Sequence, residues 1–233
     1  MDEALAAKRT SVMEALLANP GSTERTRVRR IPELAVKDRS TLHQILDAGL
    51  LGHLALADET GQPYALPVAY ARDGESLLMH GSTASRLFRL CAAGVPVCAT
   101  VTLLDGLVLA RSAFESSMNY RSVMVLGHCN VLHGKAKERG LRLISEHLMP
   151  ERWPEIREPS VQELKATAVL ELPLDECSVK INADGPDDDA ADVELPVWAG
   201  RVPLQTQWGE PIPADDLKPE YARIPDYVHR WKA

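Results

Sequence analysis

The densest group of potential ligand-binding side chains runs from His80 to Arg86, in the order His-Gly-Ser-Thr-Ala-Ser-Arg. An apolar run precedes this segment and a helical pattern follows it, which predicts a strand that turns at Gly81 into a helix over 82–93. A helix start offers unpaired backbone N–H groups and a partial positive charge, and Arg86 adds a fixed charge. Hydroxyl donors are supplied by Ser82, Thr83 and Ser85. The residue types favour phosphate binding, against the plainer interpretation of a serine cap, a surface arginine and a hydrogen-bonded strand-end histidine.

A second polar group opens a later apolar strand. Its members are Asn119, Tyr120, Arg121, Ser122 and Val123. We expect its polar residues at the mouth of a barrel, where they can face a ligand. Ordinary strand alternation explains the same pattern, with Tyr120 and Ser122 on one face and Arg121 and Val123 on the other.

A third candidate is the strand-like run 63–70, which contains Pro67. A proline inside a strand removes a ladder donor and marks an edge or a bulge. The interruption can leave backbone groups free for a ligand, and a simple edge strand is the competing interpretation.

Several classes of chemistry are excluded by what the chain lacks. The seven histidines show no metal-binding spacing, so we expect no metal site. A nucleophile elbow, a P-loop and a dinucleotide fingerprint are all missing, which argues against a hydrolase, a P-loop nucleotidase and a Rossmann dehydrogenase.

The composition is that of a globular protein of 233 residues, with 45% hydrophobic and 25% charged residues. The formal net charge is −7, which argues against a nucleic-acid partner. No apolar run is long enough for a bilayer span, and the charged N-terminus does not look like a secretory signal. The four scattered cysteines favour a reducing compartment, so we expect a cytoplasmic protein without a membrane partner.

The elements that must position these residues follow from periodicity. Helices are expected over 1–18, after Ser40, over 82–93 and over 134–148, and strands over 51–57, 64–71, 76–80, 95–103, 107–112, 120–132, 166–172 and 177–182. A helix between the third and fourth of these mostly antiparallel strands predicts a mainly β protein with flanking helices, built as a small barrel. We divide the chain into an N-terminal helix and linker (1–32), a barrel domain (33–195) and a proline-rich C-terminal arm (196–233).

Taken together, these segments resemble the pyridoxamine 5′-phosphate oxidase-like superfamily of FMN-binding split β-barrels, in the flavin-nucleotide-binding branch that includes nitroimidazole-resistance proteins. The resemblance covers roughly residues 30–210. The segments that carry it are 52–56, GQPYALPVAY (61–70), LLMHGSTASRLFRL (77–90), NYRSVMVLG (119–127), SVKINADGPDDD (178–189) and PVWAGRVPL (196–204).

The resemblance implies a homodimer with two FMN sites at the subunit interface, each lined by both chains. It places the flavin ring against Leu66, Pro67 and Val68, and the phosphate beside His80, Gly81, Ser82, Ser85 and Arg86. The segment from Asn119 to Val123 would supply further contacts, and Trp198 would close the site from the partner chain. The chain ends in PDYVHRWKA, which does not match the substrate motif of the authentic oxidase, so activity on pyridoxamine phosphate is not expected.

The resulting hypothesis is an FMN-dependent oxidoreductase that passes electrons from a reduced nicotinamide, or a similar donor, to a small organic acceptor. The cofactor carries the redox chemistry, so the lack of a catalytic triad is compatible with an enzyme. Two alternatives remain open. One is a non-catalytic flavin carrier or sensor, and the other is a haem-binding split barrel with His80, His128 or His133 as axial ligand.

Overall fold

The computed structural model describes residues 18–231, so the helix expected over 1–18 lies essentially outside the described residues. The strands are β1 (Ala35–Val36), β2 (Leu51–Ala57), β3 (Pro63–Asp73), β4 (Ser76–Ser82), β5 (Val97–Leu109), β6 (Ser117–Gly127), β7 (Asn130–Val131), β8 (Thr167–Pro173), β9 (Glu176–Asn182) and β10 (Gly200–Pro203). The α-helices are α2 (Arg39–Ala48), α3 (Arg86–Ala92), α4 (Gly134–Leu148), α5 (Val161–Ala166) and α6 (Asp226–Arg230), and short 3-10 turns are η1 (Pro32–Leu34), η2 (Trp153–Glu155) and η3 (Pro219–Tyr221).

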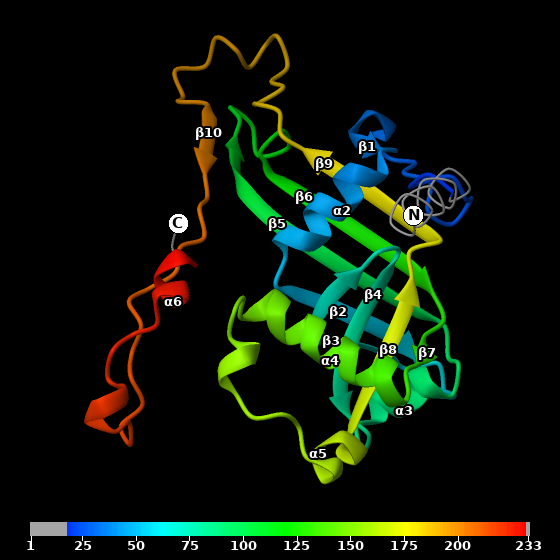
Figure 1. The fold of residues 1–233 in the computed structure, drawn as a ribbon. Coiled ribbons are helices and arrows are strands. Elements are labelled where there is room, and N and C mark those ends of the chain that lie inside the picture. The colour runs from blue at the N-terminus through cyan, green and yellow to red at the C-terminus, as the bar shows by residue number, and fades with distance from the viewer. Residues whose placement is uncertain (1–17, 232–233) are drawn as a thin grey trace, which may run out of the picture.

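The strands form one antiparallel sheet in the order β1-β9-β6-β5-β2-β3-β4-β8-β7, and β10 pairs with β5 off this path (Figure 1). β3 pairs with β2 over its first seven residues and with β4 only from Tyr70 onward. The barrel is therefore split where β3 and β4 separate. The predicted fold class, a mainly antiparallel split barrel with flanking helices, is confirmed.

The main hydrophobic core fills the inside of the barrel. α2 contributes Leu42, Ile45 and Leu46 to it, and α3 contributes Leu87 and Phe88. A smaller hydrophobic cluster lies on the outside of β3 and β4, which α4 covers. There Ile144 packs against Ala71 and Leu78. We call the barrel side of the β2–β5–β6 wall its inner face and the opposite side its outer face.

Several element boundaries differ from the sequence-based expectation. α2 is capped by Asp38, whose side chain accepts from the Thr41 N–H, and not by Ser40. β5 is one strand of 13 residues, because the expected turn at 104–106 is a bulge that shifts the register and leaves the pairing with β6 intact. The expected strand 120–132 is two strands, β6 and β7. The helix 134–148 and the strand 51–57 are confirmed at both ends.

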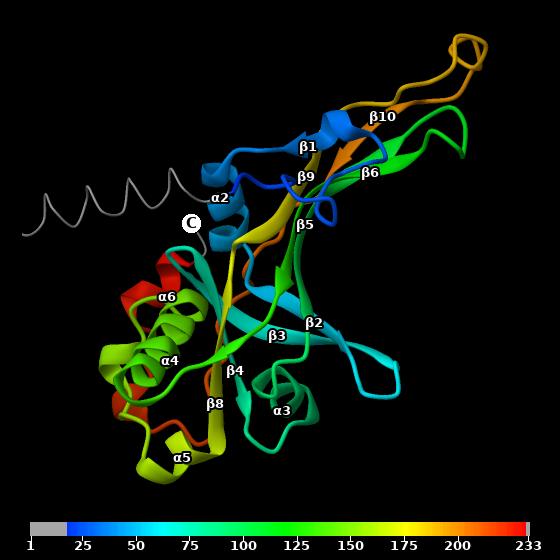
Figure 2. The same cartoon turned by 90° about the vertical axis from the view of Figure 1, so that its right-hand side faces the viewer.

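The C-terminal arm touches the rest of the chain at two places (Figures 1 and 2). β10 pairs with the last residues of β5, from Gly106 to Leu109. Farther on, the Tyr227 hydroxyl in α6 donates to Glu155 at 2.6 Å, and the Trp231 indole donates to the Pro150 carbonyl at 3.3 Å. Among the described residues, no helix is long and apolar enough to cross a membrane.

Candidate functional site

The connection between β4 and α3 lies at residues 83–85, later in the chain than predicted, and its backbone donors are largely used within the protein. β4 continues through Ser82 because β8 pairs with it up to Thr167, and α3 begins only at Arg86. The Thr83 N–H donates to the Ala166 carbonyl at 2.9 Å, and the Ser85 N–H donates to the Ser82 carbonyl at 3.0 Å. The expected helix start at Ser82 is therefore wrong. Ser85 stands at the cap position instead, and its hydroxyl makes no capping bond.

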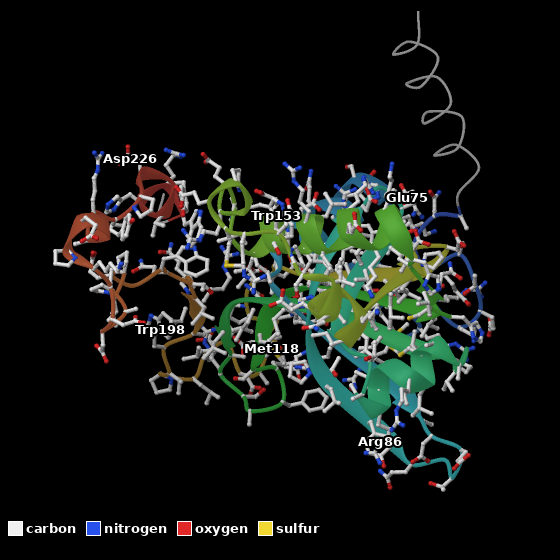
Figure 3. All side chains as sticks on the ribbon, turned by 60° about the horizontal axis from the view of Figure 1, so that its bottom comes forward. Glu75, Arg86, Met118, Trp153, Trp198 and Asp226 are labelled. Atoms are coloured by element: carbon white, nitrogen blue, oxygen red, sulfur yellow. The ribbon has the colours of Figure 1, made fainter. Side chains whose placement is uncertain are left out.

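Arg86 is the charged residue of this loop. Its guanidinium lies over the ring of Tyr64 from β3, with 4.0 Å between the guanidinium carbon and the ring centroid. No carboxylate pairs with it within the described part of the chain. Figure 3 shows Arg86 at the periphery of the molecule. The cation–π contact restrains a positive charge that has no protein counter-ion, which is a suitable arrangement for an anionic ligand.

His80 and Gly81 point to opposite faces of β4. A Cβ on Gly81 would lie 2.3 Å from the Phe88 ring, so glycine permits α3 to pack this closely. His80 shares the face of Leu78 and Val169, which α4 covers. The Nδ1 atom of His80 is buried without a hydrogen-bond partner, and burial lowers the pKa of this imidazole. His80 is thus a mostly neutral imidazole with an unused ring nitrogen.

The three residues predicted to lie under the flavin ring divide between the faces of β3. Leu66 and Pro67 are exposed, whereas Val68 packs in the main core at 8% exposure. Pro67 lies where β3 pairs with β2 alone, which confirms the edge interpretation of that proline. The Val68 side chain faces the core, so contact with a cofactor at this position would come through the backbone.

The segment 119–123 in β6 also divides by alternation. Tyr120 and Ser122 share the outer face with Leu104 and Thr102, their partners in β5. The alternate residues of the segment, Asn119, Arg121 and Val123, lie on the inner face. Val123 is a core residue at 2% exposure. The side chains of these five consecutive residues therefore lie in two different environments, the outer face and the inner face.

Arg121 is already paired within the chain. Its Nε and Nη2 atoms donate to the two carboxylate oxygens of Asp105 at 2.9 and 2.7 Å, and this hydrogen bonding raises the pKa of Arg121. Asn119 is 7% exposed, and its Oδ1 atom is buried without a partner. These residues line a cavity of about 650 Å³ together with Ile181, Asn182, Ala183, Arg201, Val202 and Pro203. The cavity lies between the barrel and β10.

The predicted residues do not converge on one point of a single chain. Arg86 and the 64–68 segment lie together, because Tyr64 touches Arg86. β6 is separated from β3 by β5 and β2, so the 119–123 segment lies about 14 Å away, or three strand spacings. Trp198 is 65% exposed and packs over Gly200, and Figure 3 shows it far from Arg86.

The outer face of the wall is apolar, and residues 18–231 of the same chain leave it uncovered. Leu107 pairs with Met118 on one side and Val202 on the other, and these residues are 51%, 50% and 47% exposed. Leu51 and Leu104 continue the face at 54% and 42%. An apolar surface of this kind marks an interaction site.

Two contributors to the site were not predicted from the sequence. Tyr64 makes the cation–π contact with Arg86, and Asp105 accepts the hydrogen bonds of Arg121. Both contacts join residues about 20 positions apart on different elements, β3 with α3 and β5 with β6, so local spacing does not reveal them. The proline-containing run around Tyr64 was the only available signal.

The split-barrel fold is the fold of a class of flavin-binding proteins, and the comparisons place the chain in that class. The model of the pyridoxamine 5′-phosphate oxidase family matches residues 38–181, more than half of the chain. The chain belongs to this family and has its flavin-binding split-barrel fold. None of the curated proteins compared with it matches.

Two solved structures are similar over nearly their whole length. The FAD and haem binding protein from Mycobacterium smegmatis is 37% identical, over 85% of this chain and 97% of that chain, with a TM-score of 0.82. The flavocytochrome Anf3 from Azotobacter vinelandii is 36% identical, over 89% and 96%, with a TM-score of 0.83. A putative 5-nitroimidazole antibiotic resistance protein from Bacteroides thetaiotaomicron shares the fold at 20% identity, over 63% and 86%, with a TM-score of 0.54.

Proposed function

We propose that this protein binds a flavin nucleotide through the β4–α3 loop and transfers electrons from a reduced nicotinamide, or a similar donor, to a small organic acceptor. The observation that carries the proposal is Arg86, a cation held over Tyr64 without a protein counter-ion. The hydroxyls of Ser82 and Ser85 lie on the same loop and complete a donor set for a phosphate.

The flavin would supply the redox chemistry, and the chain would bind and shield it. The phosphate contacts fall to Ser82, Ser85 and Arg86. The neutral imidazole of His80 has a ring nitrogen free to hydrogen-bond a ligand beside this loop. Leu66 and Pro67 are exposed on opposite faces of β3, so the ring would lie against one of these two apolar side chains, and Gly81 allows the loop to stay close to α3.

The nucleotide is proposed to be FMN or FAD. The sequence resemblance favours FMN, whereas the 37% identical relative is described as binding FAD. Both carry a phosphate at the end of the ribityl chain, so the role of Arg86 is the same for each. Mass spectrometry of the cofactor released from the purified protein distinguishes them.

A homodimer is part of the proposal. The 66–68 and 119–123 segments lie about 14 Å apart within one chain, too far to contact the same ring edge. The uncovered apolar outer face around Leu107 and Met118 is the surface we propose for a second copy. In such a dimer Tyr120, Ser122 and Trp198 would contribute to the partner's flavin site.

The phosphate assignment is tested with Arg86→Ala. Arg89→Ala is the matched control, because Arg89 is an exposed arginine on the same helix, one turn away. We expect the affinity for FMN or FAD to fall about 10- to 100-fold in the first variant, the effect of losing charged hydrogen bonds, and to stay within about twofold in the control. Equal affinities in both variants would remove the phosphate from this loop.

Haem binding is a second candidate function. The specific observation is that, of the two similar solved structures at 37% and 36% identity reported above, one is described as an FAD and haem binding protein and the other as a flavocytochrome. A haem beside a flavin would make the protein a one-electron as well as a two-electron carrier. A Soret band after incubation with hemin tests this candidate separately from flavin uptake.

A further inference from the structure

A hollow on the outer face lies at the end of the wall nearest α3. Ala55, Cys98 and Leu126 form its floor, and they are in register across β2, β5 and β6. Its volume is about 320 Å³, and its remaining lining residues are Arg25, Leu56, Pro63, Pro96, Val97, Gly127 and His128. The walls are predominantly aliphatic, with one imidazole at the edge.

The His128 ring is held in one tautomer. Its Nδ1 atom lies 2.9 Å from the carbonyl oxygen of Gly94, in the turn that follows α3. A carbonyl oxygen only accepts, so Nδ1 carries a proton, and in the neutral ring the lone pair is on Nε2. Nε2 has no hydrogen-bond partner among the described residues. A histidine anchored at one ring nitrogen by a backbone carbonyl is the usual arrangement of a metal ligand.

The hollow does not suit a bare metal ion. No group of three His, Cys, Asp or Glu residues gathers anywhere in residues 18–231. The thiol of Cys98 stays protonated because burial raises its pKa, so it is a poor second ligand. A metal that brings its own ring of four equatorial ligands needs only one axial imidazole and an apolar wall. A metalloporphyrin meets that description.

Three other histidines, in α2, α4 and β2, fit less well. His43 is paired with Glu75 at 3.1 Å, and His147 is anchored to the Gly49 carbonyl but packs against Tyr70, with 5.4 Å between ring centroids. His53 is exposed on the outer face without a partner, one row of the sheet away from the floor of the hollow. No hydrogen bond from the described part of the chain fixes its ring.

We propose that His128 is the axial iron ligand of a haem whose edge lies in this hollow. This inference rests on the haem candidate of the proposed function. His128 is one of the three histidines that the sequence left open as an axial ligand. It also places the haem at the opposite end of α3 from the phosphate loop, so that one short helix separates the two cofactor sites.

The test is a hemin titration of the full-length protein, followed by absorbance and electron paramagnetic resonance spectra. We expect the unaltered protein to give a Soret band that saturates at one haem per chain. His128→Ala should bind hemin roughly tenfold more weakly or worse, with an altered spectrum that added imidazole restores. His53→Ala is the matched control and should leave both affinity and spectrum unchanged.

A second variant guards against a folding defect at His128. Ala55→Phe fills the floor of the hollow and leaves the imidazole in place, and it should also weaken hemin binding. Flavin uptake by each variant reports that the fold is intact. An unchanged spectrum in His128→Ala would overturn the ligand assignment. A protein that takes up flavin but no hemin would overturn this inference and leave the flavin proposal standing, and a protein that takes up neither would overturn both.

Discussion

The two faces of the β2–β5–β6 wall are both apolar, yet in the part of the chain that the structure describes only one of them is covered. On the inner face Leu54, Val101 and Val125 are at most 2% exposed and pack against α2 and α3. On the outer face Leu51, Leu107 and Met118 are at least 50% exposed. The same strands therefore carry one surface that determines the fold and another that is available for recognition. The two surfaces should respond differently to mutation.

The largest expected effect is on the inner face. Leu54→Ala removes a fully buried side chain and should lower the free energy of unfolding by about 2–5 kcal/mol. Leu51→Ala, three residues earlier on the outer face, should change it by no more than about 0.5 kcal/mol. Urea denaturation at low protein concentration, where dissociation does not contribute, measures both. If both variants lost the same free energy of unfolding, the inner and outer faces would not differ in their contribution to stability.

The next effect concerns association. Leu107→Asp places a carboxylate between Met118 and Val202 in the centre of the outer face. We expect the proposed dimer to dissociate at least about tenfold more readily, with the unfolding of the monomer little changed. Sedimentation velocity measures the change, and Thr102→Asp on the same strand, nearer β2, gives a comparison. A variant that stays dimeric would place the interface elsewhere.

A smaller effect tests the charged cluster that joins α2 to the β3–β4 turn. Although burial alone would raise it, the pKa of Glu75 is lowered by its hydrogen bond to Arg39 and the charges of Arg39 and His43. The carboxylate therefore contributes stability above its ordinary pKa of 4.5, and this is lost as the pH falls through the lower folded value. Glu75→Gln should cost about 1 kcal/mol at pH 7, and the difference should vanish in acid. Thermal melts between pH 7 and pH 2 follow it.

The smallest effect is a titration shift at His80. Burial lowers the pKa of this imidazole below 6.5 in the free protein. A phosphate bound at the neighbouring loop should raise the pKa, because an anion favours the protonated form. NMR titration with and without flavin measures the shift, and His53, on another strand, serves as an internal reference. No change at His80 on flavin binding would place the phosphate away from this imidazole.

Much of the barrel could be predicted from sequence because its signals are local. The period of β2 and the amphipathic stripe of α4 fix both elements to the residue. The start of α3 was misplaced because β8, more than 80 residues away, extends β4 through Ser82. In the same way, the turn at 104–106 became a bulge because β6 continues to pair across it. Long-range pairing overrode local turn propensity in both cases.

The candidate site was predictable in type and less so in arrangement. The residues from His80 to Arg86 indicated phosphate binding through their own chemistry. The ion pair of Arg121 with Asp105 depends on a bulge, which spacing along the chain does not reveal. The division of 119–123 between two faces followed from alternation. What occupies each face is decided by packing between distant strands.

The pairing of β10 with β5 has a consequence for solubility. β2 pairs with β5 only at residues 98–100, so it does not cover the last residues of β5. Without β10, these residues would form an open strand edge with exposed Leu107 and Leu109, and such an edge can pair with other chains. β10 occupies that edge with four residues and brings a proline at its end. A chain cut before Gly200 would expose that edge, so the arm protects the protein from aggregation whatever else it does.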